Sequence, residues 1–167
     1  VMAAGRIRQI GTPQEIYNAP ADIEIARLFG DPTINLLDVT PQRSGGDVFV
    51  ELSNVRVRLG DYGADVVGRQ CVLGLRPETI SFVDAAAPGA IPVTVEAETP
   101  LNEKTVTLAL TARGREILVS RPAGTPGPTA GPAHIAVNGM QAFLFDKAGG
   151  ALLPRADLAA KRNGEAA

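Results

Sequence analysis

The chain has 167 residues, 45% of them hydrophobic but only 4% aromatic, which is enough for one ordinary domain packed with aliphatic side chains. Its 16 basic and 18 acidic residues give a net charge of −2 with no clustered basic patch, which argues against nucleic-acid binding. No apolar run approaches the roughly 20 residues of a membrane-spanning helix, and the single cysteine, Cys71, excludes an internal disulfide.

The chain opens with a predicted short strand followed by a well-marked helix start. Residues 6–10 read RIRQI, with Ile7 and Ile10 as the apolar anchors of a half-buried strand. Thr12 can cap a helix, because a proline follows at the first helical position and Glu15, three residues after Thr12, completes a capping box. This helix is expected to end before Pro20, which biases the preceding residue away from helical dihedrals.

A second short helix is expected over about residues 21–29. Ile25, Leu28 and Phe29 would share its buried face, and the Gly-Asp-Pro sequence at 30–32 would end it.

From Leu36 onward, apolar residues alternate with polar ones in short runs separated by turn residues, which predicts antiparallel strands. Ser53-Asn54 is typical of a two-residue hairpin turn, and Arg113-Gly114 of another, with the glycine free to adopt a positive φ. Residues 71–75 and 143–145 are continuous apolar runs, which suit strands buried on both faces. Roughly eight to ten short strands with little helix predict a small barrel or sandwich.

Two segments near the C-terminus read as irregular. Residues 122–132, PAGTPGPTAGP, predict a surface loop. Residues 154–167 contain few apolar side chains and predict a flexible tail, with a weakly favoured helix at 157–162.

The residues of common catalytic and metal sites are largely missing from this sequence. It contains no G-x-x-x-x-G-K-[ST] phosphate loop, and none of Lys104, Lys147 and Lys161 follows a glycine. One Cys and one His cannot supply the usual four ligands of a zinc site. For Cys71 a buried small hydrophobe is the favoured interpretation, and for His134 a loop residue.

Three stretches, in this order and spacing, resemble the C-terminal part of the ATP-binding protein of a bacterial ATP-binding-cassette importer of the maltose and glycerol-phosphate type. They are GRIRQIGTPQEIY at 5–17, PADIEIARLFGDPTINLL at 20–37 and LGLRPETI at 73–80. Within the second stretch, Gly30, Pro32 and Asn35 match a family pattern. The resemblance covers nearly the whole chain.

The resemblance implies a mainly β fold, an antiparallel barrel of the oligonucleotide-binding (OB) type, TOBE/MOP-like, with a short N-terminal strand and two short helices. Residues 1–35 would be the end of a nucleotide-binding domain, 36–153 a regulatory and dimerisation domain, and 154–167 a tail. Catalytic, cofactor and metal residues are expected to be absent here, and ATP and magnesium would be bound elsewhere in the parent protein.

The family's partners and location follow from the same resemblance. The parent is expected to be a homodimeric ATPase, cytoplasmic and held at the inner face of the membrane by permease subunits. A regulatory protein is a further possible partner. Without an ATPase domain beside them, Ile7, Ile10, Ile16 and Tyr17 are expected to lack packing partners, and the opening segment to be poorly ordered or used in a contact between chains.

Six residues are candidate site residues, each with a structural alternative. Gly68, Gly74, Arg76 and Glu78 would form a regulatory or partner surface; the alternative is a backbone turn and close strand packing for the glycines, and local hydrogen bonds or an ion pair for Arg76 and Glu78. Glu98 and Glu103 would lie at a dimer contact, or be solvated loop carboxylates.

A second function stays open at this point, namely sensing of a small oxyanion or sugar in the barrel. It requires basic groups facing one cleft, and Arg113, Arg115 and Arg121 lie in one neighbourhood of the sequence. Binding of single-stranded nucleic acid is disfavoured, because such sites use exposed aromatic side chains and a basic groove.

Overall fold

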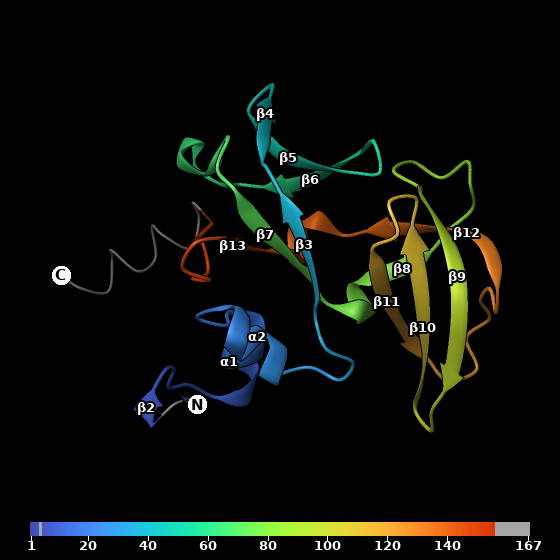
Figure 1. Cartoon of the computed structure of the whole chain (residues 1–167), viewed down its shortest axis with the longest axis horizontal. Helices are drawn as coiled ribbons and strands as arrows, with labels where there is room; N and C mark the ends of the chain where they lie inside the picture. The colour runs from blue at the N-terminus through green and yellow to red at the C-terminus, as the bar shows by residue number, and fades with distance from the viewer. Residues whose placement is uncertain (4, 156–167) are drawn as a thin grey trace.

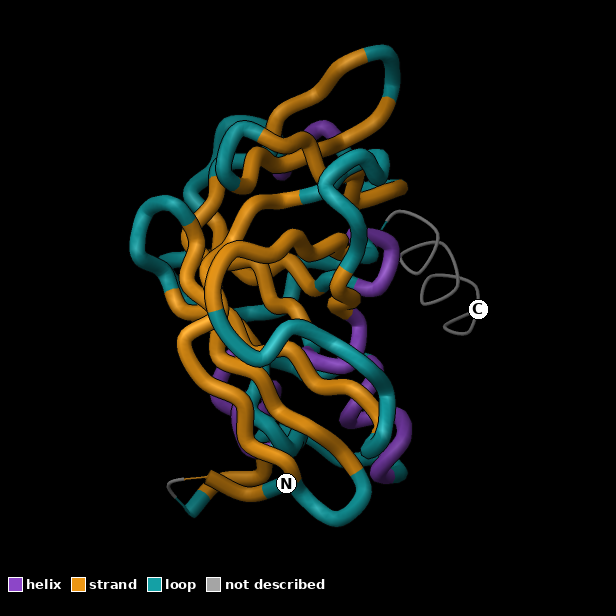
Figure 2. Tube along the Cα trace, turned by 90° about the vertical axis from the view of Figure 1, so that its right-hand side faces the viewer, coloured by secondary structure: helices purple, strands orange, loops and turns teal. Residues whose placement is uncertain are grey.

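The computed structural model describes residues 1–3 and 5–155, and its fold is mainly β (Figure 1). It starts with two-residue strands, β1 (Met2–Ala3) and β2 (Arg6–Ile7), which pair with each other, and continues with helices α1 (Pro13–Asn18) and α2 (Ile23–Leu28). Strand β2 is shorter than the strand expected over 6–10. Figures 1 and 2 both show the two helices at the N-terminal end of the molecule, away from the projecting β4–β5 hairpin.

The remaining strands form three antiparallel sheets. One has the order β11-β10-β9-β12-β8, the second β13-β7-β3 and the third β4-β5-β6. The strand bounds are β3 (Asn35–Val39), β4 (Gln42–Ser44), β5 (Asp47–Leu52), β6 (Val55–Gly60), β7 (Cys71–Leu75), β8 (Ile80–Phe82), β9 (Ile91–Pro100), β10 (Lys104–Thr111), β11 (Glu116–Pro122), β12 (Gly131–Val137) and β13 (Phe143–Asp146). Short 3-10 helices interrupt them: η1 (Ala64–Val66), η2 (Pro77–Thr79) and η3 (Gly139–Gln141).

The prediction of a mainly β, antiparallel fold with a short N-terminal strand and two short helices is confirmed by this architecture. The described residues contain more strands than the eight to ten expected. The excess comes from β1, β2, β4 and β8, which are only two or three residues long. His134 was expected in a loop, and this is wrong. It lies in β12 with its Cα opposite that of Pro92 on β9.

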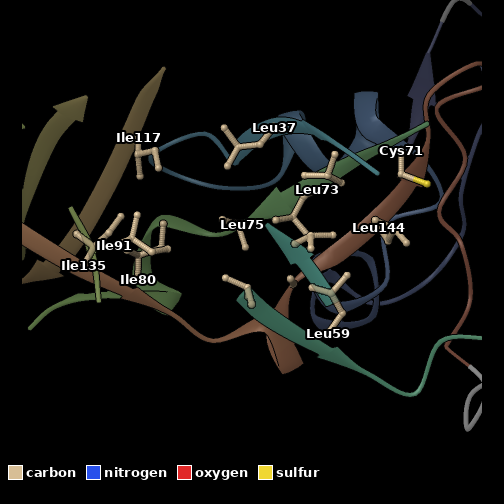
Figure 3. Close-up of a cluster of buried hydrophobic side chains, with 14 of the residues drawn as sticks. Leu37, Leu59, Cys71, Leu73, Leu75, Ile80, Ile91, Ile117, Ile135 and Leu144 are labelled. Atoms are coloured by element: carbon tan, nitrogen blue, oxygen red, sulfur yellow. The ribbon is translucent and has the colours of Figure 1, made fainter. Parts of the chain in front are cut away.

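The main core is one aliphatic cluster shared by the three sheets (Figure 3). Alternate residues of the longer strands β5, β6, β7 and β9 point into it, as the period-two pattern predicts. Its labelled members in Figure 3 are Leu37, Leu59, Cys71, Leu73, Leu75, Ile80, Ile91, Ile117, Ile135 and Leu144. Cys71 is fully buried among them, as predicted, and burial raises the pKa of its thiol.

Strands β7 and β13 are buried on both faces, as their continuous apolar runs predict. Leu73 and Leu144 point into the main core, whereas Phe145 points the opposite way into a second, smaller cluster that includes Ala26 of α2 and Ile34. The helices therefore cover the outer face of the β13-β7-β3 sheet.

Local sequence signals place the helices well. Thr12 and Glu15 form the predicted capping box, since the Thr12 backbone N–H donates to Glu15 Oε2 at 2.7 Å and the Glu15 N–H donates to Thr12 Oγ1 at 3.3 Å. In α2, Ile25 is buried but Leu28 is 64% exposed. The expectation that both share the buried face is wrong for Leu28; the fully buried Ala26 packs against the sheet instead, in the cluster with Ile34 and Phe145.

Both predicted hairpin turns are present. Ser53 and Asn54 have φ of 50° and 67°, the left-handed pair that a type I′ turn requires. Gly114 has a φ of 71° at the tip of the β10–β11 hairpin. These two turns fix the register of hairpins β5–β6 and β10–β11.

Asn35 joins two sheets that share no backbone ladder at this point. Its amide group behaves like a strand partner for Leu118 of β11, accepting from the Leu118 N–H at 2.7 Å and donating to the Leu118 carbonyl at 2.9 Å. The same Nδ2 donates to the Leu75 carbonyl at 3.1 Å. Asn35 is only 7% exposed. Leaving the backbone groups that it bonds without a partner at this buried place would lower the stability of the fold.

We expect Asn35→Ala to lower the free energy of unfolding by about 2–4 kcal/mol, because it removes these bonds and leaves buried backbone groups without partners. Urea denaturation followed by circular dichroism measures the change. Asn102→Ala, at an exposed position in the β9–β10 turn, is the control and should shift stability by less than about 0.5 kcal/mol. Equal stability of the two variants would contradict the role assigned to Asn35.

Candidate functional site

The most unusual group in the described residues is Arg76, which follows the buried strand β7 and is only 2% exposed. Strand β7 points the side chain out of the main core and toward the two helices. Its Nη1 donates to the Ala26 carbonyl at 3.0 Å and also to the Phe29 carbonyl, and its Nη2 donates to the Tyr17 carbonyl at 3.0 Å.

These carbonyls lie in the last turn of α1, in the last turn of α2 and at the residue that ends α2. Carbonyls at a helix C-terminus have no partner within the helix and carry partial negative charge, so a guanidinium satisfies them well. Arg76 thus binds the ends of both helices at once.

Aromatic rings complete the surroundings of Arg76. Its Cζ lies 4.0 Å from the ring centroid of Tyr17 and 5.6 Å from that of Phe143. No carboxylate in the described part of the chain pairs with it, and burial lowers the pKa of the guanidinium. The charge is therefore stabilised by carbonyl oxygens and ring faces rather than by an opposite charge.

Gly30 makes room for this guanidinium. A Cβ at this position would lie 2.7 Å from Arg76 Nη1, and its φ of 153° is one that side chains rarely allow. Two residues of the Gly-x-Pro-x-x-Asn pattern thus have physical roles, since Gly30 admits Arg76 and Asn35 joins β3 to β11.

The structure does not gather the four residues of the predicted regulatory surface. Gly68 precedes β7, whereas Gly74 and Arg76 lie at its other end. Gly74 packs closely, because a Cβ there would lie 2.8 Å from Phe145 Cε2 and 3.0 Å from Ile34 Cδ1. Glu78 is exposed in η2.

The alternative of a local ion pair between Arg76 and Glu78 is wrong, because the guanidinium points to the helices instead. With its side chain buried, Arg76 cannot itself form an exposed partner surface. Whether a regulator binds near Gly68, Gly74 or Glu78 stays a prediction.

Of the two predicted dimer-contact residues, only Glu98 has a side-chain partner among the described residues. Its carboxylate pairs with Arg121, whose Nη1 donates to Thr107 Oγ1 at 2.7 Å and whose Nε donates to the Thr125 carbonyl at 3.0 Å. Glu103 is exposed in the β9–β10 turn. Their part in a dimer stays a prediction.

The opening segment differs from the expectation of lost packing. Ile7 and Ile10 are 64% and 84% exposed, as expected. Ile16 is buried, however, and Tyr17 lies under Arg76, so these two residues have partners within the chain.

The hydrogen bonds from Arg76 to the ends of the two helices were not predicted from the sequence. The available signal was an arginine directly after a continuous apolar strand, where its side chain must find buried partners.

Comparison with known proteins supports this architecture. Residues 30–80 match the family described as the MalK OB fold domain. The chain is 34% identical over 149 residues to the sn-glycerol-3-phosphate import ATP-binding protein UgpC of Escherichia coli K12, and 37% identical to that of Salmonella typhimurium. Both alignments cover 87% of this chain and 40% of the relative. UgpC 1 of Rhizobium johnstonii is 38% identical over 97 residues, covering 58% of this chain and 26% of the relative.

A solved structure of the cytoplasmic molybdate-binding protein ModG, with molybdate bound, aligns with a TM-score of 0.47 and 10% identity. It covers 66% of this chain and 94% of that chain.

Fold and site together define a mainly β domain of the OB type with a helical segment bound to it through Arg76. More particularly, the chain is similar over 87% of its length to ATP-binding proteins named for glycerol-phosphate import, which confirms the resemblance seen in the sequence. It spans about 40% of the length of the longer-matching curated relatives.

The described residues contain no helix long and apolar enough to cross a bilayer. Within the same part of the chain, no three His, Cys, Asp or Glu side chains gather as metal ligands would.

We expect Arg76→Met to release α1 and α2 from the barrel, because their terminal carbonyls lose their donor while side-chain volume is roughly kept. Amide exchange in residues 13–28 should become roughly 30- to 1,000-fold faster, corresponding to about 2–4 kcal/mol. Mass-spectrometric hydrogen exchange resolves this segment from β9–β11.

Arg27→Met removes the same charge from an exposed position on α2 and is the matched control. Arg76→Lys should give an intermediate effect, since a single ammonium cannot reach all three carbonyls. Unchanged exchange in the helices of Arg76→Met, or an equal increase in β9–β11, would contradict the assignment.

Proposed function

We propose that this chain is the C-terminal regulatory and dimerisation part of the ATP-binding subunit of an importer for a sugar or related solute. The observation that carries the proposal is the alignment with import ATP-binding proteins over 87% of the chain. An alignment that covers 87% of the chain must include β3 to β12, whichever residue it begins at. The similarity therefore extends well beyond the 51 residues that match the MalK OB fold domain at 30–80.

In this proposal the chain does not hydrolyse ATP. Its sequence lacks a glycine-rich phosphate loop with its lysine. ATP and magnesium would be bound by another part of the parent protein, whose end is represented here by β2, α1 and α2.

The barrel would act by binding, first to its own copy. A paired barrel keeps two ATPase halves together while they open and close, and a two-fold contact uses the same patch on both copies. The β9–β10 turn supports such a contact, because Leu101 is 46% exposed there beside the exposed carboxylate of Glu103.

The helical segment would transmit the position of the barrel to the ATPase domain. Arg76 supports this role, since it fixes both helix ends to the end of β7 through buried hydrogen bonds. The parent would be cytoplasmic and peripheral at the inner face of the membrane through permease subunits, with a regulatory protein as a further partner.

We expect the chain to form a concentration-dependent dimer in sedimentation velocity at micromolar concentrations. Glu103→Lys should weaken the dimer about three- to tenfold, because a reversed charge at the edge of a contact changes its electrostatic complementarity. Asp61→Lys makes the same charge reversal at an exposed loop residue and should leave the equilibrium unchanged.

A strictly monomeric chain at high micromolar concentration would refute the dimerisation half of the proposal. If Glu103→Lys leaves the dimer unaffected, the β9–β10 turn is not part of the contact.

A further inference from the structure

Residues 150–155, which we call the strap, run back along the outer edge of β13. In Figure 1 they form the red end of the ribbon, next to the β13 label. The Asp146 N–H donates to the Ala151 carbonyl at 2.8 Å. The Leu153 N–H donates to the Leu144 carbonyl, also at 2.8 Å. The strap therefore pairs with backbone groups that the edge of a sheet would otherwise leave open.

The other edge of the strap bonds to the start of α2. The Ile23 N–H donates to the Gly150 carbonyl at 3.0 Å. The Leu152 N–H donates to the Ala21 carbonyl at 3.0 Å, and an antiparallel bridge lies between these two bonds. The strap thus bonds to the barrel on one side and to the helical segment on the other. It is a second connection between them, at the opposite end of α2 from the carbonyls that Arg76 binds.

Arg155 anchors the far end of the strap. Its Nη2 donates to the Ala142 carbonyl at 2.8 Å and to the Gly139 carbonyl at 3.1 Å. Its Nη1 donates to the Leu59 carbonyl, and its Cζ lies 4.9 Å from the ring centroid of Tyr62. No carboxylate in the described part of the chain forms an ion pair with this guanidinium. Arg155 therefore fixes the strap to β6 and to both ends of the short helix η3.

This anchor resembles the surroundings of Arg76, since each guanidinium bonds to three carbonyls and lies against one tyrosine ring. A glycine makes room in both places, because a Cβ at Gly60 would lie 3.0 Å from Arg155 Nη1, as a Cβ at Gly30 would crowd Arg76. The two arginines differ in burial: Arg76 is 2% exposed, whereas Arg155 is only partly buried. Water can replace the bonds of Arg155 while the core stays closed, but freeing Arg76 requires the helices to leave the sheet.

Little apolar surface holds the strap in place. Ala151 and Pro154 are exposed. Leu152 and Leu153 are only partly buried, Leu152 against the small cluster and Leu153 against the main core. Segments that are held mainly by backbone hydrogen bonds, with few buried side chains, open locally at a lower free energy than global unfolding requires. The strap is therefore the weaker of the two connections between helices and barrel.

We propose that residues 150–155 form a releasable strap, anchored by Arg155, whose release loosens the start of α2 while the barrel and the Arg76 junction stay folded. Release opens the outer edge of β13 and leaves the Ile23 N–H without its acceptor. The chain thus has a conformational device that sets how firmly the helical segment is held. The inference goes beyond the proposed function and depends neither on dimerisation nor on ATP binding by the parent protein.

Hydrogen exchange of the 167-residue chain, resolved for single amides by nuclear magnetic resonance, tests the proposal without any substitution. The amides of Ile23, Leu152 and Leu153 all donate across the two edges of the strap. We expect them to share one protection factor, because one local opening breaks all three bonds, and to be at least about tenfold less protected than the amides of β7. Protection as strong as that of β7 would mean that the strap does not open separately, which would refute the proposal.

Arg155→Met removes the anchor while roughly keeping side-chain volume. The protection factors of the Ile23, Leu152 and Leu153 amides should fall about three- to thirtyfold, because the strap loses the hydrogen bonds of its guanidinium. The amides of β7 and β9–β11 should keep their protection within about twofold, since their own bonds are untouched. Arg113→Met removes the same charge from an exposed residue of the β10–β11 turn. It is the matched control and should leave all of these amides unchanged.

Three results with Arg155→Met would overturn the proposal. Unchanged exchange would show that Arg155 does not anchor the strap. An equal loss of protection in β7 would make Arg155 a general stabilising residue. A loss confined to Leu152 and Leu153, with Ile23 unchanged, would show that the strap does not hold the helix. None of these results bears on sedimentation, so this proposal and the dimerisation proposal fail separately.

Discussion

The burial of a guanidinium without a carboxylate partner is the constraint on which the junction of this molecule depends. Arg76 can stay charged at 2% exposure only because carbonyl oxygens and the Tyr17 ring surround it. Those carbonyls are available only when α1 and α2 end where they do. The helix ends and the barrel therefore stabilise each other, and two short helices that would be marginal alone are held in place.

The segment between α2 and β3 has a sequence that serves this junction. Gly30 lies where any side chain would collide with Arg76, and Asn35 lies where β3 must be joined to β11 without a backbone ladder. The Gly-x-Pro-x-x-Asn pattern therefore has a physical explanation at both ends. A side chain at Gly30 would clash with Arg76, and Asn35 supplies hydrogen bonds to backbone groups that would otherwise have no partner.

Local sequence signals predicted most of the helices, strands and turns. They did not predict which side chains far apart in the sequence contact each other. The Thr12 capping box and the Ser53-Asn54 turn involve residues a few positions apart, so the sequence alone specifies them. Arg76 contacts residues 47 to 59 positions away, and Arg121 pairs with Glu98 across three strands. Such partners depend on how sheets and helices pack, which is also why Leu28 faces solvent although its spacing predicts burial.

The core of the barrel and the helices are connected through a short chain of contacts. Leu37 and Ile117 of the main core are close in sequence to Asn35 and Leu118, whose hydrogen bonds join β3 to β11, and Asn35 also bonds the Leu75 carbonyl, one residue before Arg76. Packed and hydrogen-bonded residues thus run from the main core to both helix ends. Contiguity alone does not make a switch. A change in the barrel moves the helices only if the β3–β11 junction has two arrangements whose populations can shift.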